Sequence, residues 1–97
     1  MFNRLGSRDL ADFAIELAQE FTKRCPPELA GRSAIAVARA IDEVCNRAVA
    51  YQRSRRLGIY GKARLGTEFK LRLRESGYVE EFVDELTTKL LMNMSGK

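Results

Sequence analysis

Apolar residues recur at the spacing of an α-helix in three separate stretches of this 97-residue chain. The first stripe is Leu10, Phe13, Ala14, Leu17 and Phe21, the second is Val37, Ile41, Val44, Ala48 and Tyr51, and the third is Val79, Phe82, Val83, Leu86, Leu90 and Met94. Steps of three and four residues place each set on one face of a helix, which is buried when helices pack together. The pattern therefore predicts an all-α fold.

Local signals mark the ends of the first helix. Asp9 is predicted to cap its start, because a carboxylate accepts from the free backbone N–H groups there. Lys23 and Arg24 suit its end, where the helix dipole favours cations. Residues 25–27 read Cys-Pro-Pro and cannot continue the helix, since proline lacks a backbone N–H.

The second helix is predicted to run from about Ser33 to about Arg55, which makes it the longest of the chain. Its many alanines favour close packing on more than one side, as expected of a central helix. Two interpretations of its start are open. Either Pro27 begins a short turn through Ala30, or Ser33 is the cap.

Three glycines interrupt the helical pattern between residues 57 and 66 and predict a loop. Residues 68–74 then alternate apolar and charged side chains, which is typical of a strand. Thr67 and Gly77, however, suit the cap and the end of a helix, and a lone strand has no partner for its backbone. We therefore predict a short helix here, with a hairpin between residues 58–65 and this segment as the alternative.

Together these elements predict a compact bundle of about four helices, with a long central helix and a glycine-containing basic loop. The length fits a single domain over residues 1–97, because smaller pieces would bury too little core. The predicted core contains Phe13, Leu17, Ile41, Val44, Phe69, Phe82, Leu86 and Leu90.

The side-chain inventory narrows the possible chemistry. The chain has no histidine, which removes the commonest general base and metal ligand. Its two cysteines, Cys25 and Cys45, are too few for a four-ligand zinc site and are predicted to be reduced and buried. We expect neither a metal nor a cofactor. Apolar runs are short and no secretory signal is visible, so we expect a cytoplasmic protein.

Two glycine motifs near the centre of the chain are incomplete. Gly61 and Lys62 resemble the end of a Walker A loop, but Ala63 stands where a hydroxyl should hold magnesium. Gly58 and Gly61 match GXXG literally, without the flanking elements that such a loop needs. Neither motif predicts a phosphate-binding loop of a known kind.

Positive charge is concentrated in residues 47–74, which we call the basic block. This block carries nine cations and a single carboxylate, whereas residues 1–46 have a net charge of −1 and residues 75–97 of −3. The whole chain has a net charge of +4, so the block holds more than all of it. Charge segregated in this way indicates a polyanionic partner, an acidic surface or a solvated face.

Nucleic-acid binding through the phosphates is the leading interpretation, with DNA and RNA both open and weak sequence discrimination expected. Tyr51 and Tyr60 lie in the basic block and are candidates for stacking on unpaired bases. The predicted binding residues are Arg53, Arg55, Arg56, Tyr60, Lys62, Arg64, Lys70, Arg72 and Arg74.

The alternative is protein interaction, in which carboxylates of the last helix, Glu80, Glu81, Asp84 and Glu85, face the arginines in the same subunit or in a partner. A homodimer is expected, because the core is small and the long helix carries apolar residues beyond one stripe. A small helical mutase that holds a dianion among cations is a distant third, since no catalytic constellation is visible. We therefore predict a non-catalytic binding protein.

Overall fold

The computed structural model describes residues 2–95, with side chains from residue 9 onward. This part of the chain folds into helices without strands: α1 (Phe2–Arg24), α2 (Pro27–Ala30), α3 (Ala34–Arg55), α4 (Ile59–Glu75) and α5 (Glu80–Ser95). The predicted all-α class is confirmed. The fifth helix beyond the expected four is the single turn of α2.

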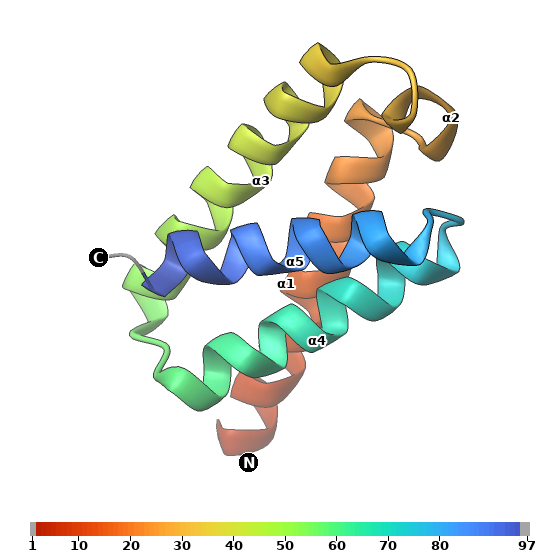
Figure 1. Cartoon of the computed structure of the whole chain (residues 1–97). Coiled ribbons are helices and arrows are strands. Elements are labelled where there is room, and N and C mark those ends of the chain that lie inside the picture. The colour runs from red at the N-terminus through yellow and green to blue at the C-terminus, as the bar shows by residue number, and fades with distance from the viewer. Residues whose placement is uncertain (1, 96–97) are drawn as a thin grey trace.

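The long helices pack in two crossed pairs (Figure 1). α1 and α3 are joined through α2, and α4 and α5 run antiparallel beside each other across them. α1 packs mainly on α4, while α3 packs on α5 and α1. The core therefore lies where the two pairs cross, and each long helix contributes to it.

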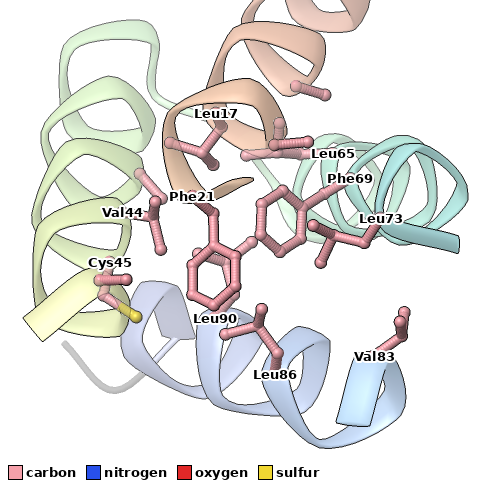
Figure 2. Packing of buried hydrophobic residues seen from close by; sticks show 14 of the residues in the cluster. Leu17, Phe21, Val44, Cys45, Leu65, Phe69, Leu73, Val83, Leu86 and Leu90 are labelled. Atoms are coloured by element: carbon pink, nitrogen blue, oxygen red, sulfur yellow. The ribbon is translucent and has the colours of Figure 1, made fainter. Parts of the chain in front are cut away.

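Figure 2 shows this core from close by. Side chains of all four long helices converge there, including Phe21 from α1, Val44 from α3, Phe69 from α4 and Leu90 from α5. Five predicted core residues are fully buried, namely Leu17, Val44, Phe69, Leu86 and Leu90. The other three, Phe13, Ile41 and Phe82, are half-buried at the edge of the core.

Both interpretations of the start of the long helix hold. Pro27 begins the short helix α2, and Ser33 then caps α3, because its Oγ accepts a hydrogen bond from the backbone N–H of Ala36 at 3.1 Å. The predicted cap of the first helix is wrong. α1 begins at Phe2, so Asp9 lies inside the helix and its carboxylate is free to contact α3.

The predicted glycine-containing loop is also wrong, because α4 runs without interruption from Ile59 to Glu75. Its glycines mark close packing instead of a break. A Cβ at Gly66 would lie 3.0 Å from Leu91 Cδ2 on α5, and one at Gly61 would lie 3.1 Å from Leu57 Cδ2. The predicted short helix over residues 68–74 is confirmed as the second half of α4.

Gly77 ends α4 at the predicted place, with a positive φ of 104° that favours glycine. The turn then buries Tyr78, whose hydroxyl donates a hydrogen bond to the backbone carbonyl of Cys25. The Tyr78 ring also packs against Phe82 and Phe21. This turn therefore ties the α4–α5 pair to the end of α1.

Candidate functional site

Six of the nine cations in the basic block lie within 4 Å of a carboxylate. The pairs are Arg47 with Glu20 at 3.5 Å, Arg55 with Asp9 at 2.9 Å, Arg64 with Glu68 at 3.7 Å, Lys70 with Asp84 at 2.9 Å, Arg72 with Glu75 at 3.4 Å, and Arg74 with Glu80. All are at the surface, where one pair contributes at most about 1 kcal/mol to stability. Their main effect is to reduce the local positive potential.

In the C-terminal half of α4, two of the three cations are neutralised by carboxylates of α5. Lys70 pairs with Asp84 and Arg74 pairs with Glu80, both across the α4–α5 contact. Pairing between the basic block and the acidic helix within one subunit was one of the predicted alternatives, and it holds for these two cations. Along α4 itself, Arg72 is held by Glu75.

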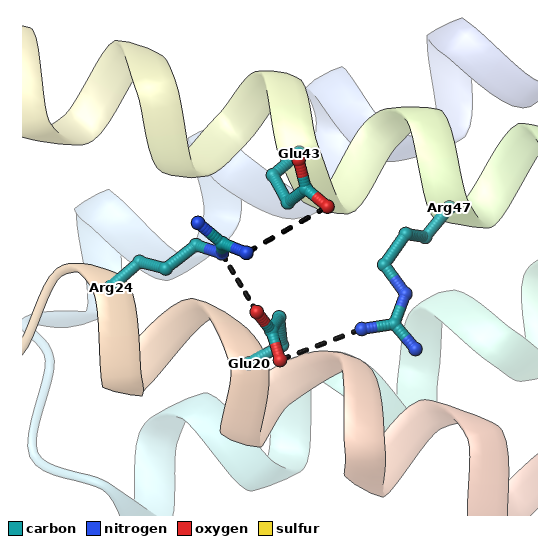
Figure 3. Close-up of polar contacts among 4 residues, drawn as sticks. All are labelled: Glu20, Arg24, Glu43 and Arg47. Carbon is teal, nitrogen blue, oxygen red and sulfur yellow. Dashed lines mark hydrogen bonds and ion pairs between the residues drawn. The ribbon is translucent and has the colours of Figure 1, made fainter.

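Arg47 belongs to a four-residue network between α1 and α3 (Figure 3). The Glu20 carboxylate forms ion pairs with Arg24 at 2.7 Å and with Arg47 at 3.5 Å. Arg24 also lies 3.8 Å from the Glu43 carboxylate. A surface depression of about 550 Å³ lies beside this network. Its charged lining is mixed, with Glu16 as well as Glu20 opposing Lys23 and Arg47, so it favours no single sign of ligand.

Arg55 and Tyr51 are engaged with α1. The Tyr51 ring stacks on Phe13 with centroids 3.9 Å apart, and its hydroxyl donates a hydrogen bond of 2.7 Å to Asp9. Arg55 pairs with the same carboxylate and lies 5.2 Å from the centre of the Tyr51 ring. Burial, then the hydrogen bond and charge of Asp9, raise the pKa of Tyr51 to about 12. Tyr51 is therefore a packed residue and not an open stacking surface.

The remaining cations of the block, Arg53, Arg56 and Lys62, have no carboxylate within 4 Å among the side chains of residues 9–95. Arg53 lies on the last turn of α3, Arg56 is the residue that ends this helix, and Lys62 lies on the first turn of α4. All three fall within residues 53–62, which we call the α3–α4 corner (Figure 1).

The α3–α4 corner also exposes two large apolar side chains. Ile59 is 86% exposed and Tyr60 is 81% exposed at the start of α4. Tyr60 is the only exposed aromatic residue among the side chains that the structure describes, whereas the other six rings pack in pairs or in the core. Ile59 was not among the predicted site residues, because the expected loop gave no reason to single out an apolar side chain there.

Two features of this corner carry a local energetic cost. Arg56 ends α3 in the left-handed conformation, with φ 55° and ψ 51°, which lets its N–H bond to the Gln52 carbonyl but costs a residue other than glycine about 1–2 kcal/mol. The first turn of α4 has no acidic residue, and Gly58 supplies no side-chain cap. Lys62 thus sits near the positive end of a helix dipole, where a carboxylate would be stabilising and a cation is not.

The nine predicted site residues therefore divide along α4. Five of them lie at the corner, and Arg64 lies two residues beyond it on α4. The five are Arg53, Arg55, Arg56, Tyr60 and Lys62. Lys70, Arg72 and Arg74 lie near the opposite end of α4, beside carboxylates of α5 and Glu75. The structure does not gather all nine on one surface.

Both predicted buried cysteines are buried, and burial raises the pKa of the Cys25 and Cys45 thiols. Within residues 2–95, no three His, Cys, Asp or Glu side chains are grouped as metal ligands. None of the helices described is long and apolar enough to cross a membrane. No protein-family model, curated protein or solved structure matches the chain.

Proposed function

We propose that the protein binds nucleic acid with low sequence specificity, through contacts of the α3–α4 corner with backbone phosphates. One observation carries the proposal. The three cations of the basic block that have no carboxylate within 4 Å among the described side chains, Arg53, Arg56 and Lys62, all lie within ten residues, next to the exposed Tyr60. Cations that neutralise phosphates release condensed counterions, which is the main source of non-specific affinity for nucleic acid.

The local physics of the corner supports a partner outside the fold. Arg56 holds an unfavourable backbone conformation, and Lys62 lies at the wrong end of a helix dipole. The conformation of Arg56 serves to end α3, whereas the placement of Lys62 does not stabilise the folded chain. An approaching phosphate would offset the cost at Lys62, because it pairs with this side chain and accepts from backbone N–H groups at the start of α4.

The salt dependence of binding tests this proposal. We expect the affinity for a short labelled nucleic acid of random sequence to fall linearly on a log–log plot between about 50 and 200 mM salt. A triple variant, Arg53→Gln/Arg56→Gly/Lys62→Gln, should flatten that slope by about 2–3, since each phosphate contact contributes roughly 0.7–0.9. Anisotropy of the labelled nucleic acid measures both quantities.

A matched control separates a local site from a general attraction to positive charge. The control variant Lys70→Gln/Arg72→Gln/Arg74→Gln also removes three positive charges, but from the C-terminal end of α4, where each cation is paired with a carboxylate. It should change the slope much less than the corner variant. Equal losses in the two variants, or no binding by the unmodified protein at low salt, would contradict the proposal.

Arg56→Gly alone guards against a trivial explanation. Glycine adopts the left-handed conformation without strain, so this variant should be as stable as the parent protein or more stable by up to about 1 kcal/mol. If Arg56→Gly binds nucleic acid more weakly than the parent protein but unfolds at the same or a higher denaturant concentration, the loss of affinity is due to the missing cation and not to unfolding.

A protein partner, including a second copy of this chain, is the second candidate. Exposed Ile59 and Tyr60 favour it, because large apolar side chains grouped at a surface are typical of interfaces. Glu81 and Glu85 on α5 have no cation within 4 Å among the described side chains and would complement the corner of another copy. Light scattering should then show a dimer that dissociates with salt and is lost in Ile59→Ser.

A further inference from the structure

We propose that the α3–α4 corner selects single-stranded over double-stranded nucleic acid, by stacking one unpaired base on the ring of Tyr60. This inference rests on the proposed function, and it concerns the same site. Phosphate contacts alone do not distinguish the two forms in this way, because both present charged backbones. The selectivity comes from one side chain whose surroundings differ from those of every other ring that the structure describes.

The faces of the Tyr60 ring are not covered by the fold. Among the side chains of residues 9–95, Tyr60 has no aromatic neighbour, whereas Tyr51 is stacked on Phe13 and Tyr78 is packed against Phe21 and Phe82. Within the part of the chain whose side chains are described, the only cation over a ring is Arg55, and it covers Tyr51. With 81% of its surface exposed, Tyr60 presents an apolar face to solvent at the edge of the most cationic part of the molecule.

Its neighbours along α4 leave room for a base. Ala63 and Thr67 are exposed and small, and they follow Tyr60 on the same side of the helix at intervals of three and four residues. Arg64 lies one turn from Tyr60 on α4, and its ion pair with Glu68 is long, at 3.7 Å. The phosphate of a nucleotide whose base stacks on Tyr60 would therefore lie within reach of the Arg64 side chain.

Base pairing decides which nucleic acid can use this surface. In a duplex both faces of each internal base are covered by its neighbours, so stacking on a protein ring requires a base to leave the helix, at a cost of a few kcal/mol. An unpaired base meets no such cost. Stacking on an aromatic side chain changes affinity by about 5- to 150-fold per base and tolerates any base.

Three ligands with equal numbers of phosphates separate stacking from backbone contact. They are an oligothymidine, an abasic strand of the same length, and a short duplex of equal charge. We expect the oligothymidine to bind at least about fivefold more tightly than the abasic strand. Equal affinity for these two strands would overturn the stacking proposal while leaving the proposed function intact. Failure of all three ligands to bind would overturn both.

Variants of Tyr60 assign the difference to this ring. Tyr60→Ala should lower the affinity for oligothymidine to that for the abasic strand and should leave abasic binding unchanged. Tyr60→Phe should retain the preference, and Tyr51→Phe is the control for a packed tyrosine. Because the chain contains no tryptophan, Tyr60→Trp also provides a single reporter. Its fluorescence should be quenched by oligothymidine and not by the abasic strand, and equal quenching by both would contradict stacking.

Discussion

The two ends of α4 lie beside equal numbers of the cations compared, three at each, but in opposite electrostatic situations. At the C-terminal end, Lys70 and Arg74 meet carboxylates of α5, and Arg72 meets Glu75. At the α3–α4 corner, Arg53, Arg56 and Lys62 meet none among the described side chains. Among the described side chains, the carboxylates of α5 pair with α4 only at Lys70 and Arg74. A count of charge along the chain therefore overstates the basic surface, which the fold reduces to one corner.

The ends also differ in what covers their apolar residues. The C-terminal half of α4 buries Phe69 and Leu73 completely, whereas the corner leaves Ile59 and Tyr60 in water. The buried end contributes to folding, whereas the exposed side chains Ile59 and Tyr60 of the corner contribute little to it. This contrast makes clear predictions, because substitutions at one end should act on stability and substitutions at the other on binding.

The largest expected difference is between two aromatic residues of the same helix. Phe69→Ala should lower the free energy of unfolding by about 3–5 kcal/mol, since it leaves a cavity in the core. Tyr60→Ala should change it by less than about 0.5 kcal/mol, as for other exposed positions. Urea titration followed by circular dichroism measures both. A large loss of stability in Tyr60→Ala would contradict the assignment of this ring to binding.

Two glycines provide the next comparison. Gly66→Val should destabilise the protein by about 1–3 kcal/mol. The new Cβ would lie 3.0 Å from Leu91 Cδ2, and the two further methyl groups would crowd the contact between α4 and α5. Gly58→Ala at the corner should change stability by less than about 0.5 kcal/mol, since no atom would lie within 4 Å of the new Cβ. Thermal unfolding of the two variants checks this order, and equal effects would show that α4 and α5 are not in close contact at Gly66.

The contact between Tyr51 of α3 and α1 makes a pH-dependent prediction. The pKa of Tyr51 rises from 10.0 to about 12 on folding, so between these values the folded state keeps a proton that the unfolded state loses. Stability should therefore fall as the pH rises through this window. Tyr51→Phe should reduce that fall and should cost about 1 kcal/mol at neutral pH, where the hydrogen bond to Asp9 is missing.

Denaturant titrations at a series of alkaline pH values test this prediction. Tyr78, whose pKa is also raised by burial, is present in both proteins, so the difference between them isolates Tyr51. Parallel pH profiles for the parent protein and Tyr51→Phe would mean that Tyr51 does not carry the effect.

The smallest effects should come from the charges themselves. A double-mutant cycle on Lys70 and Asp84 should give a coupling of no more than about 1 kcal/mol, which declines as salt is added. Lys62→Gln should leave stability unchanged or raise it slightly, because this cation has no carboxylate within 4 Å in residues 9–95 and lies near the positive end of a helix dipole. A clear loss of stability in Lys62→Gln would show that the corner contains a partner for it and would weaken the comparison.

The sequence predicts the elements whose signals are local and repeated. The apolar stripes locate α1, α3 and α5, the Ser33 cap locates the start of α3, and Gly77 locates the end of α4. It does not predict α4 as a whole. Gly61 and Gly66 resemble helix breakers locally, but Leu57 and Leu91 determine their role, and these contacts exist only in the folded chain.

The candidate site shows the same limit. Tyr51 and Tyr60 are equivalent by sequence, since both lie in the basic block. Phe13, nearly forty residues before Tyr51, decides that Tyr51 is packed and Tyr60 is open. Likewise, the sequence indicates that the last helix complements the arginines, but only the packing of α5 on α4 shows which of them it reaches.

The hydrogen bond from Tyr78 to the carbonyl of Cys25 has a consequence for how the protein is made. The two residues are 53 positions apart in the chain. At a synthesis rate of about 5–20 residues per second, Tyr78 is translated roughly 3–10 s after Cys25, the residue that it contacts at the end of α1. Phe21 lacks its partners Tyr78 and Phe82 during that interval. The contacts of Phe21 with Tyr78 and Phe82 therefore form only after these residues are translated, and a chain truncated before α5 would leave this apolar face of α1 uncovered.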